Sequence, residues 1–345
     1  MSDMVVHSGV LSPAALQAVR AAFTAHPQAR IAIALSGGAD SAMLALAAVA
    51  VAREASAAVR PVRPIRAFHI HHGLFAAADR WADDVRALCA GFDLPLDVVH
   101  VKVASDTGRG IEAAAREARY AAFAQMAAAA DIDTLWMAHH RDDQAETVLL
   151  RLLRGSGVAG MGGMAEHSHR LGLTLVRPWL DIERTVLREA ATRFTEATGW
   201  VPVEDPSNAD PAYTRAAVRT LLAPVLNARW PQWRGILARH ARHMREANEI
   251  LSEVAAEDLA RLEPSPDAAS VSLAAWRTLS PARQRQVLRH WLDRSGAPMP
   301  TDARLSELAR QLRQLHSLGH DRQLRWHHGT FCIVCVRGRI CVEKT

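Results

Sequence analysis

The sequence is poor in the features that mark secreted and membrane-bound chains. Its 345 residues include four cysteines, at 89, 332, 335 and 341, too few and too clustered for a disulfide framework. The first residues, MSDMVVHSGVLSP, lack a basic stretch followed by a long apolar core, so no signal peptide is predicted. The longest apolar run, Ala42–Ala52, is too short to span a bilayer. These absences predict a cytoplasmic protein with no membrane partner.

The length is sufficient for two domains, and the charge is unevenly divided between them. From Leu226 onward there are 19 Lys and Arg against 12 Asp and Glu, a net charge of +7. The preceding part has 22 against 24, a net charge of −2. A basic C-terminal third is expected of a nucleic-acid-binding region. A solvated Arg-rich helical surface is an equally good explanation on charge alone.

The first two hundred residues alternate between short β-prone runs and long Ala-rich stretches. The alternation predicts an α/β fold with a five-stranded, mostly parallel, doubly wound sheet. Its strands are expected at 31–35, 65–70, 96–101, 134–138 and 171–180, and its helices at 41–53, 76–91, 111–130 and 143–154. In such folds ligands bind beyond the carboxyl ends of the strands, and the polar motifs fall there.

The pattern changes after 205-DPSNADP-211. Helices are expected at 211–227, 231–263, 281–295 and 301–315, followed by a terminal β-hairpin with its turn near Arg337–Gly338. We therefore predict a catalytic domain over residues 1–226 and a smaller, mainly helical, basic domain over residues 227–345. The long helix at 231–263 is expected to connect them.

The stretch 36-SGGADS-41 lies between the first strand and the first long helix. Glycines at 37 and 38 allow close approach of an anion to the backbone, and the helix N-terminus adds free amides. No G-x-x-x-x-G-K-[ST] or G-x-G-x-x-G pattern is present, so neither the common P-loop nor the dinucleotide fingerprint applies. Asp40 is a candidate Mg²⁺ ligand beside a bound phosphate. The alternative is a plain turn capped by Asp40 or Ser36.

Further polar residues follow the other strands. They lie in 69-HIHHGL-74, 112-EAAAREARYAAF-123, 138-AHHRDDQAETVLLRLLRGSGVAGMGGM-164, 178-PWL-180 and 204-EDPSNADPAYTRAAVR-219. Asp143 and Glu146 are one helical turn apart and share a face. Asp142 is expected mainly to cap its helix, and Glu112 with Arg116 has the spacing of a helical ion pair. The histidines at 69, 71 and 72 and the Cys332–Cys335 pair lack the further ligands that a zinc site needs.

The S-G-G-x-D-S loop resembles that of the N-type ATP pyrophosphatases, which cleave ATP to AMP and pyrophosphate and leave AMP on a substrate oxygen. The other motifs together resemble the tRNA(Ile)-lysidine synthetase family, nearly end to end in the N-terminal domain and more weakly through 287-VLRHWLDRSGAPMP-300. The resemblance implies ATP and Mg²⁺, an isoleucine tRNA with anticodon CAU, and L-lysine. It implies that the C2 oxygen of the wobble cytidine is adenylated, that the lysine ε-amine attacks C2, and that AMP leaves to give lysidine.

The resemblance also assigns residues. Asp40, Asp143, His139 and Arg119 are the expected catalytic residues. The ATP and pyrophosphate ligands are expected among Ser36, Gly37, Gly38, Ala39, Asp40, Ser41 and His69, and the lysine or adenylate ligands among Arg116, Arg119, His140, Glu146 and Arg215. Arg119 is favoured over Arg116 as a fork for the lysine carboxylate or the adenylate phosphate. Ala216 stands where the family's Y-x-R-N-x-x-R pattern has Asn.

Three alternatives stay open at this point: another ATP pyrophosphatase acting on a different carbonyl, a metal-dependent phosphohydrolase of the all-helical HD type, and an inert RNA-binding module. A lone Cys89 in the first domain argues against the thiolation branch of the superfamily. We expect Arg283–Arg289 and Arg304–Arg313 to contact tRNA phosphates, and only the first of the family's C-terminal domains to be present. The sequence leaves the oligomeric state open, a homodimer included.

Overall fold

The computed structural model describes residues 9–57, 64–71, 73, 78–101, 111–315 and 324–344, without the side chains at 55–57, 111–113 and 207. The chain divides into two compact units, one ending at Arg242 and the other beginning at His243. The domain boundary near residue 226 stays a prediction.

The N-terminal unit contains a six-stranded sheet with the strand order β3-β2-β1-β4-β6-β5. Its strands are β1 (Ile31–Ala34), β2 (Ile65–His71), β3 (Leu96–His100), β4 (Thr134–Trp136), β5 (His167–Arg170) and β6 (Leu173–Val176). All neighbouring pairs are parallel except β5 with β6. The predicted α/β class and the five predicted strands are confirmed, and β5 is an additional antiparallel edge strand. Its exposed and half-buried residues give no buried periodicity that sequence reading could detect.

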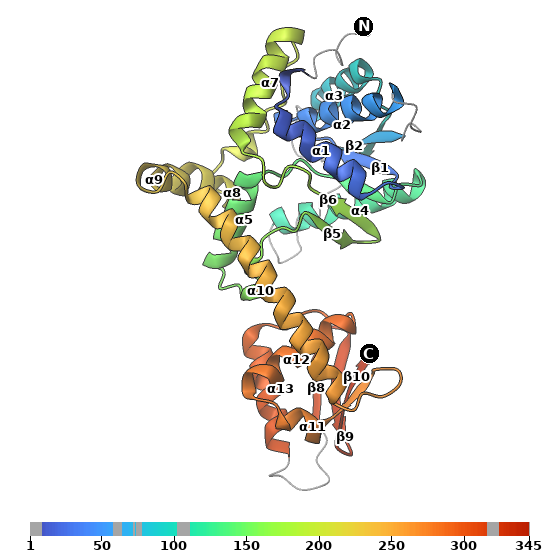
Figure 1. The fold of residues 1–345 in the computed structure, drawn as a ribbon, viewed down its shortest axis with the longest axis vertical. Helices are drawn as coiled ribbons and strands as arrows, with labels where there is room; N and C mark the ends of the chain where they lie inside the picture. Colours follow the sequence, from blue (N-terminus) through green and yellow to red (C-terminus); the bar gives the residue numbers. More distant parts are fainter. Residues whose placement is uncertain are drawn as a thin grey trace. The chain divides into compact units, whose positions relative to one another are not determined.

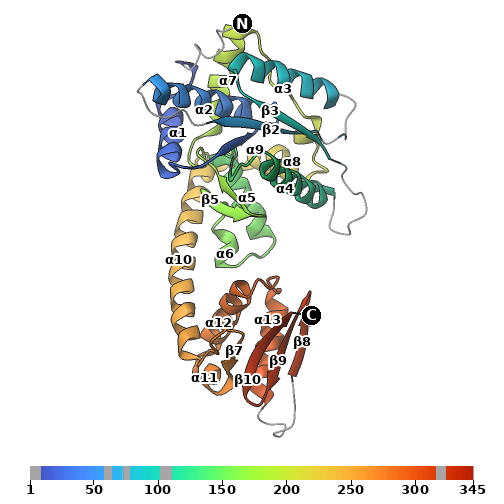
Figure 2. The same ribbon diagram turned by 90° about the vertical axis from the view of Figure 1, so that its right-hand side faces the viewer.

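Helices cover both faces of this sheet, as Figure 2 shows for α4 on the side opposite α2 and α3. The helices of the unit are α1 (Pro13–Ala25), α2 (Ala39–Ala57), α3 (Ala78–Phe92), α4 (Ile111–Ala129), α5 (Arg141–Leu153), α6 (Val158–Met161), α7 (Arg184–Thr198), α8 (Thr214–Ala217) and α9 (Ala223–Arg229). A short 3-10 helix, η2 (Pro206–Asn208), a short π-helix, η3 (Val218–Leu222), and the start of α10 (Trp233–Arg261) complete it. None of the helices in the described ranges has the length and apolar character needed to cross a membrane.

The core follows directly from the alternation of side chains along the strands. In β1, Ile31 and Ile33 join the core made with α1, α2, α3 and α7, whereas Ala32 joins the core under α4. Residues 41–51 of α2 are buried all around the helix, which explains why that segment is a continuous apolar run.

The strand order reverses between β1 and β4, which are neighbours in the sheet although β2 and β3 lie between them in sequence. Such a reversal opens a crevice at the carboxyl ends of the two strands. The Ser36–Ser41 loop follows β1, and His139 and His140 follow β4. The topology therefore brings the two most distinctive motifs of the sequence to one place.

The C-terminal unit packs three short helices and the end of α10 against an antiparallel sheet with the order β7-β10-β9-β8. Its elements are β7 (Ser270–Ser272), α11 (Leu273–Thr278), α12 (Pro281–Arg294), α13 (Asp302–Gln314), β8 (Leu324–His328), β9 (Phe331–Val336) and β10 (Arg339–Lys344) (Figure 1). The predicted hairpin is confirmed as β9 and β10, and β7 and β8 extend it to four strands. Arg337 and Gly338 both have positive φ, as a two-residue type I′ turn requires.

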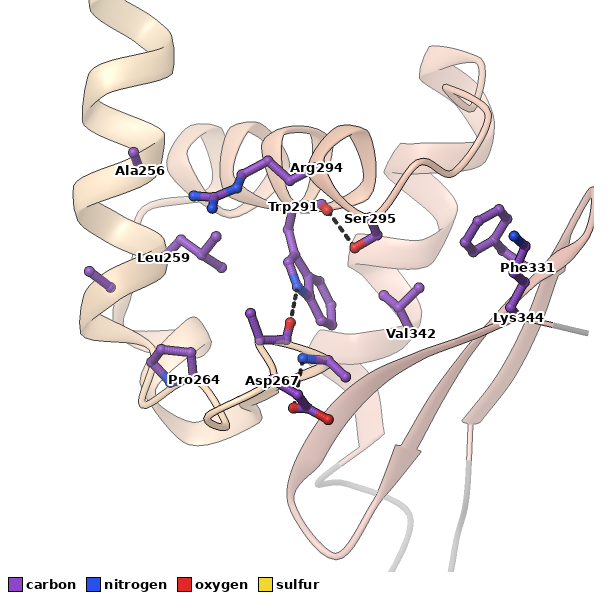
Figure 3. Close-up of a pocket in the computed structure, with 13 residues that line it drawn as sticks. Ala256, Leu259, Pro264, Asp267, Trp291, Arg294, Ser295, Phe331, Val342 and Lys344 are labelled. Carbon is purple, nitrogen blue, oxygen red and sulfur yellow. Dashed lines mark hydrogen bonds between the residues drawn. The ribbon is translucent and has the colours of Figure 1, made fainter. Parts of the chain in front are cut away.

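A pocket of about 550 Å³ lies within the C-terminal unit (Figure 3). Trp291 forms one wall, and its indole nitrogen donates a hydrogen bond to the Ala268 carbonyl at 3.0 Å. Apolar Leu259 and charged Asp267 and Arg294 also line the pocket. Trp291 is only 2% exposed, and its hydrogen bond to Ala268 anchors the loop at 264–269 to α12. The pocket lies at this attachment.

Candidate active site

The loop after β1 is held in shape by hydrogen bonds among its own residues. The Ser41 hydroxyl accepts the Ser36 N–H at 3.1 Å and donates to the Gly38 carbonyl at 3.0 Å. Gly37 has a φ of +85°, and a Cβ there would lie 2.9 Å from the Val203 side chain. Only glycine fits this position. The first turn of α2 follows at once, so its free backbone amides border the loop, as in an anion-binding site.

Asp40 meets two residues of the β4–α5 segment. The Nε2 atom of His140 lies 3.5 Å from Asp40 Oδ2 and 3.4 Å from Asp143 Oδ2. Burial disfavours the imidazolium, but the hydrogen bond to Asp40 and the charge of Asp143 outweigh it and raise the pKa of His140. Asp40 Oδ1 is buried and has no hydrogen-bond partner in the described part of the chain, while the side chain as a whole is 27% exposed.

His140 is also the N-cap of α5. Its Nδ1 accepts the Asp143 N–H at 3.3 Å, and Asp143 Oδ2 accepts the His140 N–H at 3.2 Å, which together make a capping box. The expectation that Asp142 caps this helix is wrong. Asp142 instead accepts the Arg184 N–H at 3.2 Å and forms an ion pair with Arg234 at 2.7 Å, because its side chain faces α7 and α10.

Arg219 connects Asp143 and Glu146, two of the carboxylates of α5. Its Nη2 donates to Asp143 Oδ1 at 3.0 Å and its Nε donates to Glu146 Oε1 at 2.7 Å. Burial raises the pKa of Asp143, but the charges of His140 and Arg219 outweigh this and lower it, so Asp143 is ionised at neutral pH. Glu146 Oε2 is buried without a partner among the described residues.

A group of guanidinium ions gathers around Tyr120, on α4. Arg170 lies 4.3 Å, Arg116 5.2 Å and Arg119 5.8 Å from the ring centroid. Arg177 donates to the Ala165 carbonyl and the Ser168 hydroxyl at 2.7 and 3.0 Å. Within the described ranges no carboxylate pairs with any of these four arginines, and the Nε atoms of Arg119 and Arg177 are buried without partners. This arrangement is typical of a site that binds an anion.

His139 lies between the acidic and the basic groups. Burial lowers its pKa to about 3; the Asp143 carboxylate opposes this shift, and the guanidinium ions of Arg177, Arg215 and Arg119 add to it. The imidazole is therefore neutral at physiological pH, and its Nδ1 has no partner in the part of the chain that the structure describes. His139 is thus available as a neutral donor or acceptor.

The structure places the other predicted site residues as follows. Arg215 donates to the Thr147 hydroxyl at 3.0 Å, on the same helix as Asp143 and Glu146. His69 is buried, and its Nδ1 lies 2.8 Å from the Leu35 carbonyl at the end of β1. Ala39 opens α2. Arg151 donates to the Gly160 and Gly163 carbonyls at 2.7 Å each.

Some predicted contacts lie outside the described residues, and some site residues were missed. The side chain of Glu112 and the whole of His72 are not described, so neither interpretation is tested. Tyr120 and Arg177 were assigned no role. Arg177 directly precedes the quoted 178-PWL-180, and a charged residue at the end of a buried strand was the signal that could have identified it.

Comparison with known proteins agrees with this geometry. The PP-loop domain family matches residues 12–226, so the N-terminal unit is a PP-loop domain. A U34-tRNA thiolase, NcsA from Methanococcus maripaludis with its [4Fe-4S] cluster, shares the fold with a TM-score of 0.51 at 16% identity, over 67% of this chain and 78% of that one.

A second family, the TilS substrate binding domain, matches residues 272–341. The tRNA(Ile)-lysidine synthase of Bordetella pertussis is 54% identical over 91% of this chain and 96% of its own length. That of Bordetella parapertussis is 55% identical over 96% of each chain. The chain belongs to the tRNA(Ile)-lysidine synthase family.

Proposed function

We propose that this protein uses ATP to attach L-lysine to C2 of the wobble cytidine of a CAU-anticodon isoleucine tRNA. The observation that carries the proposal is the meeting of Asp40, from the loop after β1, with His140 and Asp143 at the start of α5. It joins a phosphate-binding loop to an acidic cluster, the two features that adenylation followed by amine attack requires. Membership of the family supplies the substrate class.

In the first step, the C2 oxygen of cytidine attacks the α-phosphorus of ATP, and pyrophosphate leaves. The role of the Ser36–Ser41 loop is to hold the triphosphate on its backbone amides and on the N-terminus of α2, which favour the charge that develops on the leaving group. A Mg²⁺ ion fits beside Asp40, since Asp40 Oδ1 is a buried carboxylate oxygen without a partner in the described part of the chain. When bound, the ion would neutralise phosphate charge.

In the second step, the lysine ε-amine forms a bond to C2, and the C–O bond breaks to release AMP with the former C2 oxygen. The amine has a pKa of about 10.4 in water and must lose a proton before it attacks. We assign the ammonium group to Glu146, whose free Oε2 is buried beside the Arg219–Asp143 pair. Arg219 orients both carboxylates through its hydrogen bonds to them.

The carboxylate of lysine needs a cationic partner away from the reacting amine. Arg119 is the best candidate, because its Nε is buried without a partner among the described residues and because Arg116 and Arg170 flank the same tyrosine ring. A bidentate contact from one guanidinium would fix both oxygens of the carboxylate. The neutral imidazole of His139 separates the two charged groups and does not add a further cation.

The experiment is incorporation of radiolabelled L-lysine into an unmodified CAU-anticodon isoleucine tRNA transcript, with pyrophosphate release followed in parallel. We expect ATP-dependent incorporation by the intact protein and none with a transcript in which C34 is U. Asp40→Ala should lower the rate by about 100-fold or more, as loss of one charge-stabilising group does in other active sites. Glu189→Ala, which removes an exposed carboxylate from α7, is the matched control and should keep the full rate.

The two possible outcomes of this experiment distinguish the proposed reaction from its alternative. Incorporation that requires ATP, C34 and Asp40 together supports the reaction, the substrate and the role of the loop. ATP cleavage to AMP without lysine incorporation would mean that this PP-loop protein acts on another acceptor, and the proposal would be wrong.

A further inference from the structure

Residues 211–245 contain seven arginines and not one aspartate or glutamate. This stretch forms α8, η3, α9 and the start of α10. The arginines are Arg215, Arg219, Arg229, Arg234, Arg239, Arg242 and Arg245. A surface segment with one sign of charge over this length attracts a polyanion and repels acidic proteins.

One face of the segment is fixed to the catalytic helix. Trp233 and Ala223 are buried against Ala145 of α5, in a small core that Leu226 and Leu237 complete. Polar contacts continue this attachment toward the active site, where Arg219 binds the carboxylates of α5. Figure 1 shows α9 and the first turns of α10 beside α5. The segment is therefore a rigid neighbour of the reacting groups.

The opposite face is apolar and open. Leu221 and Val225 are 60% and 63% exposed, and Trp230 is 54% exposed at the corner between α9 and α10. The guanidinium of Arg229 lies 5.6 Å from the Trp230 ring centroid. Among the described residues no carboxylate pairs with Arg229, Arg239 or Arg242, all three of which are exposed.

An exposed indole beside unpaired arginines suits single-stranded RNA better than a protein partner. Unpaired nucleobases stack on aromatic rings, while the phosphates that join them bind guanidinium ions. A protein partner would need acidic side chains opposite the arginines and an apolar surface opposite Trp230. Single-stranded RNA carries both the apolar faces and the anions on every nucleotide, so the charge of the segment favours RNA.

We propose that η3, α9 and the first turns of α10 form a single-stranded RNA surface, on which Trp230 stacks an unpaired base of the anticodon loop. Arg229, Arg239 and Arg242 contact the phosphates of the same strand. The identity of the RNA as a tRNA loop rests on the proposed function. The surface would hold the nucleotides that flank the reacting cytidine, because the segment begins at the Arg219–Asp143 contact and continues outward from it.

The first test measures the Kd of the full-length protein for an anticodon stem–loop RNA with a CAU loop, by filter binding without ATP or lysine. Trp230→Ala should raise this Kd by about 5- to 150-fold, the usual loss for one stacked base. Trp230→Phe, which keeps a stacking ring, should stay within about threefold of the original protein. Val201→Ala is the control, since Val201 is an apolar residue of the same unit that is 67% exposed.

The second test measures the salt dependence of the same Kd. The double variant Arg239→Gln/Arg242→Gln should lower the slope of log Kd against log salt by about 0.7 for each lost phosphate contact. Arg188→Gln removes an exposed charge from α7 and should leave the slope unchanged. A blunt duplex of the same stem, which offers no unpaired base, should bind Trp230→Ala and the original protein equally.

The outcomes separate this proposal from its rivals. Unchanged stem–loop affinity in Trp230→Ala would overturn it, and a sedimentation shift of that variant from a larger species to a monomer would assign the surface to a second copy of the chain. If Val201→Ala lost as much stem–loop affinity as Trp230→Ala, the proposal would also be overturned, because the loss would not be specific to Trp230. Stem–loop binding requires no catalysis, so a failure of lysine incorporation in the original protein would reject the proposed function and leave this result standing.

Discussion

Arg219 illustrates how a single residue supports both the fold and the candidate site. Asp143 and Glu146 are 8% and 4% exposed, and Arg219 is the one guanidinium that forms an ion pair with each of them in the described part of the chain. Two buried carboxylates require a cation, since removing one partner of a buried pair leaves an uncompensated charge. The acidic cluster therefore depends on a residue that lies 73 positions beyond Glu146 in the sequence.

Replacing Arg219 by methionine keeps most of the side-chain volume and removes the charge. We expect Arg219→Met to lower the free energy of unfolding by about 3 kcal/mol at neutral pH, measured by urea denaturation. Arg188→Met, at an exposed position on α7, is the control and should change the free energy by less than about 0.5 kcal/mol.

The same difference should depend on pH in a defined direction. The pKa of Asp143 in the folded protein is below its ordinary value of 3.8, so the stabilisation by its charge is present above that value and is lost as the pH falls through the folded pKa. The gap between the original protein and Arg219→Met should therefore be constant from about pH 5 to 7 and narrow below about pH 4. A gap that stays constant into acid would show that Arg219 acts through packing alone.

The loop after β1 is the element in which sequence and structure agree most closely, and its two glycines are not equivalent. A Cβ on Gly37 would lie 2.9 Å from both the Val85 and the Val203 side chains, in a backbone conformation with a φ of +85°. A Cβ on Gly38 would meet only the Ser36 hydroxyl at 3.5 Å and the Val203 carbonyl at 3.8 Å, which are ordinary contacts.

We therefore expect Gly37→Ala to destabilise the protein by about 2–4 kcal/mol, from backbone strain and overpacking together. Gly38→Ala should cost less than about 1 kcal/mol, because it needs neither an unusual φ nor any displacement. Thermal unfolding of the two variants side by side measures the difference. Equal melting temperatures would mean that the loop rearranges to accept a side chain at Gly37.

Motifs beside strand ends were predictable because topology alone brings them together. The meeting of Asp40 with His140 and Asp143 follows from the strand order. Contacts between distant elements could not be read in this way: Asp142 was expected to cap α5, but its side chain is held by Arg184 and Arg234. The strand β5 escaped detection because an exposed edge strand needs no apolar alternation.

At the scale of the whole chain, the number of arginines overstates how many guanidinium groups are free to bind phosphate. The excess of arginine after residue 226 predicted phosphate contacts on the helices at 283–289 and 304–313. Within the C-terminal unit Arg283 pairs with Asp258, Arg310 pairs with Glu307, and Arg313 donates to the Gln284 side chain at 2.9 Å. A sequence gives the net charge but not the pairing, so the phosphate-binding role of those helices stays a prediction.

The two units have separate hydrophobic cores, and two buried tryptophans provide a matched pair of probes. Trp179 in the N-terminal unit and Trp276 in the C-terminal unit are each 0% exposed. Each donates one indole hydrogen bond to a backbone carbonyl, at 3.0 and 3.2 Å respectively. The cores around them share no buried residue.

We expect Trp276→Ala to destabilise the C-terminal unit by about 3–5 kcal/mol and Trp179→Ala to destabilise the N-terminal unit by a similar amount, since each leaves a large cavity. Each substitution should lower the melting temperature of one calorimetric transition and leave the other in place, because stability is local where cores are separate. Loss of ATP protection against unfolding should accompany Trp179→Ala alone, which assigns the transitions. If both variants shifted a single transition equally, the chain would unfold as one cooperative body, and the long helix α10 would have to transmit stability between the units.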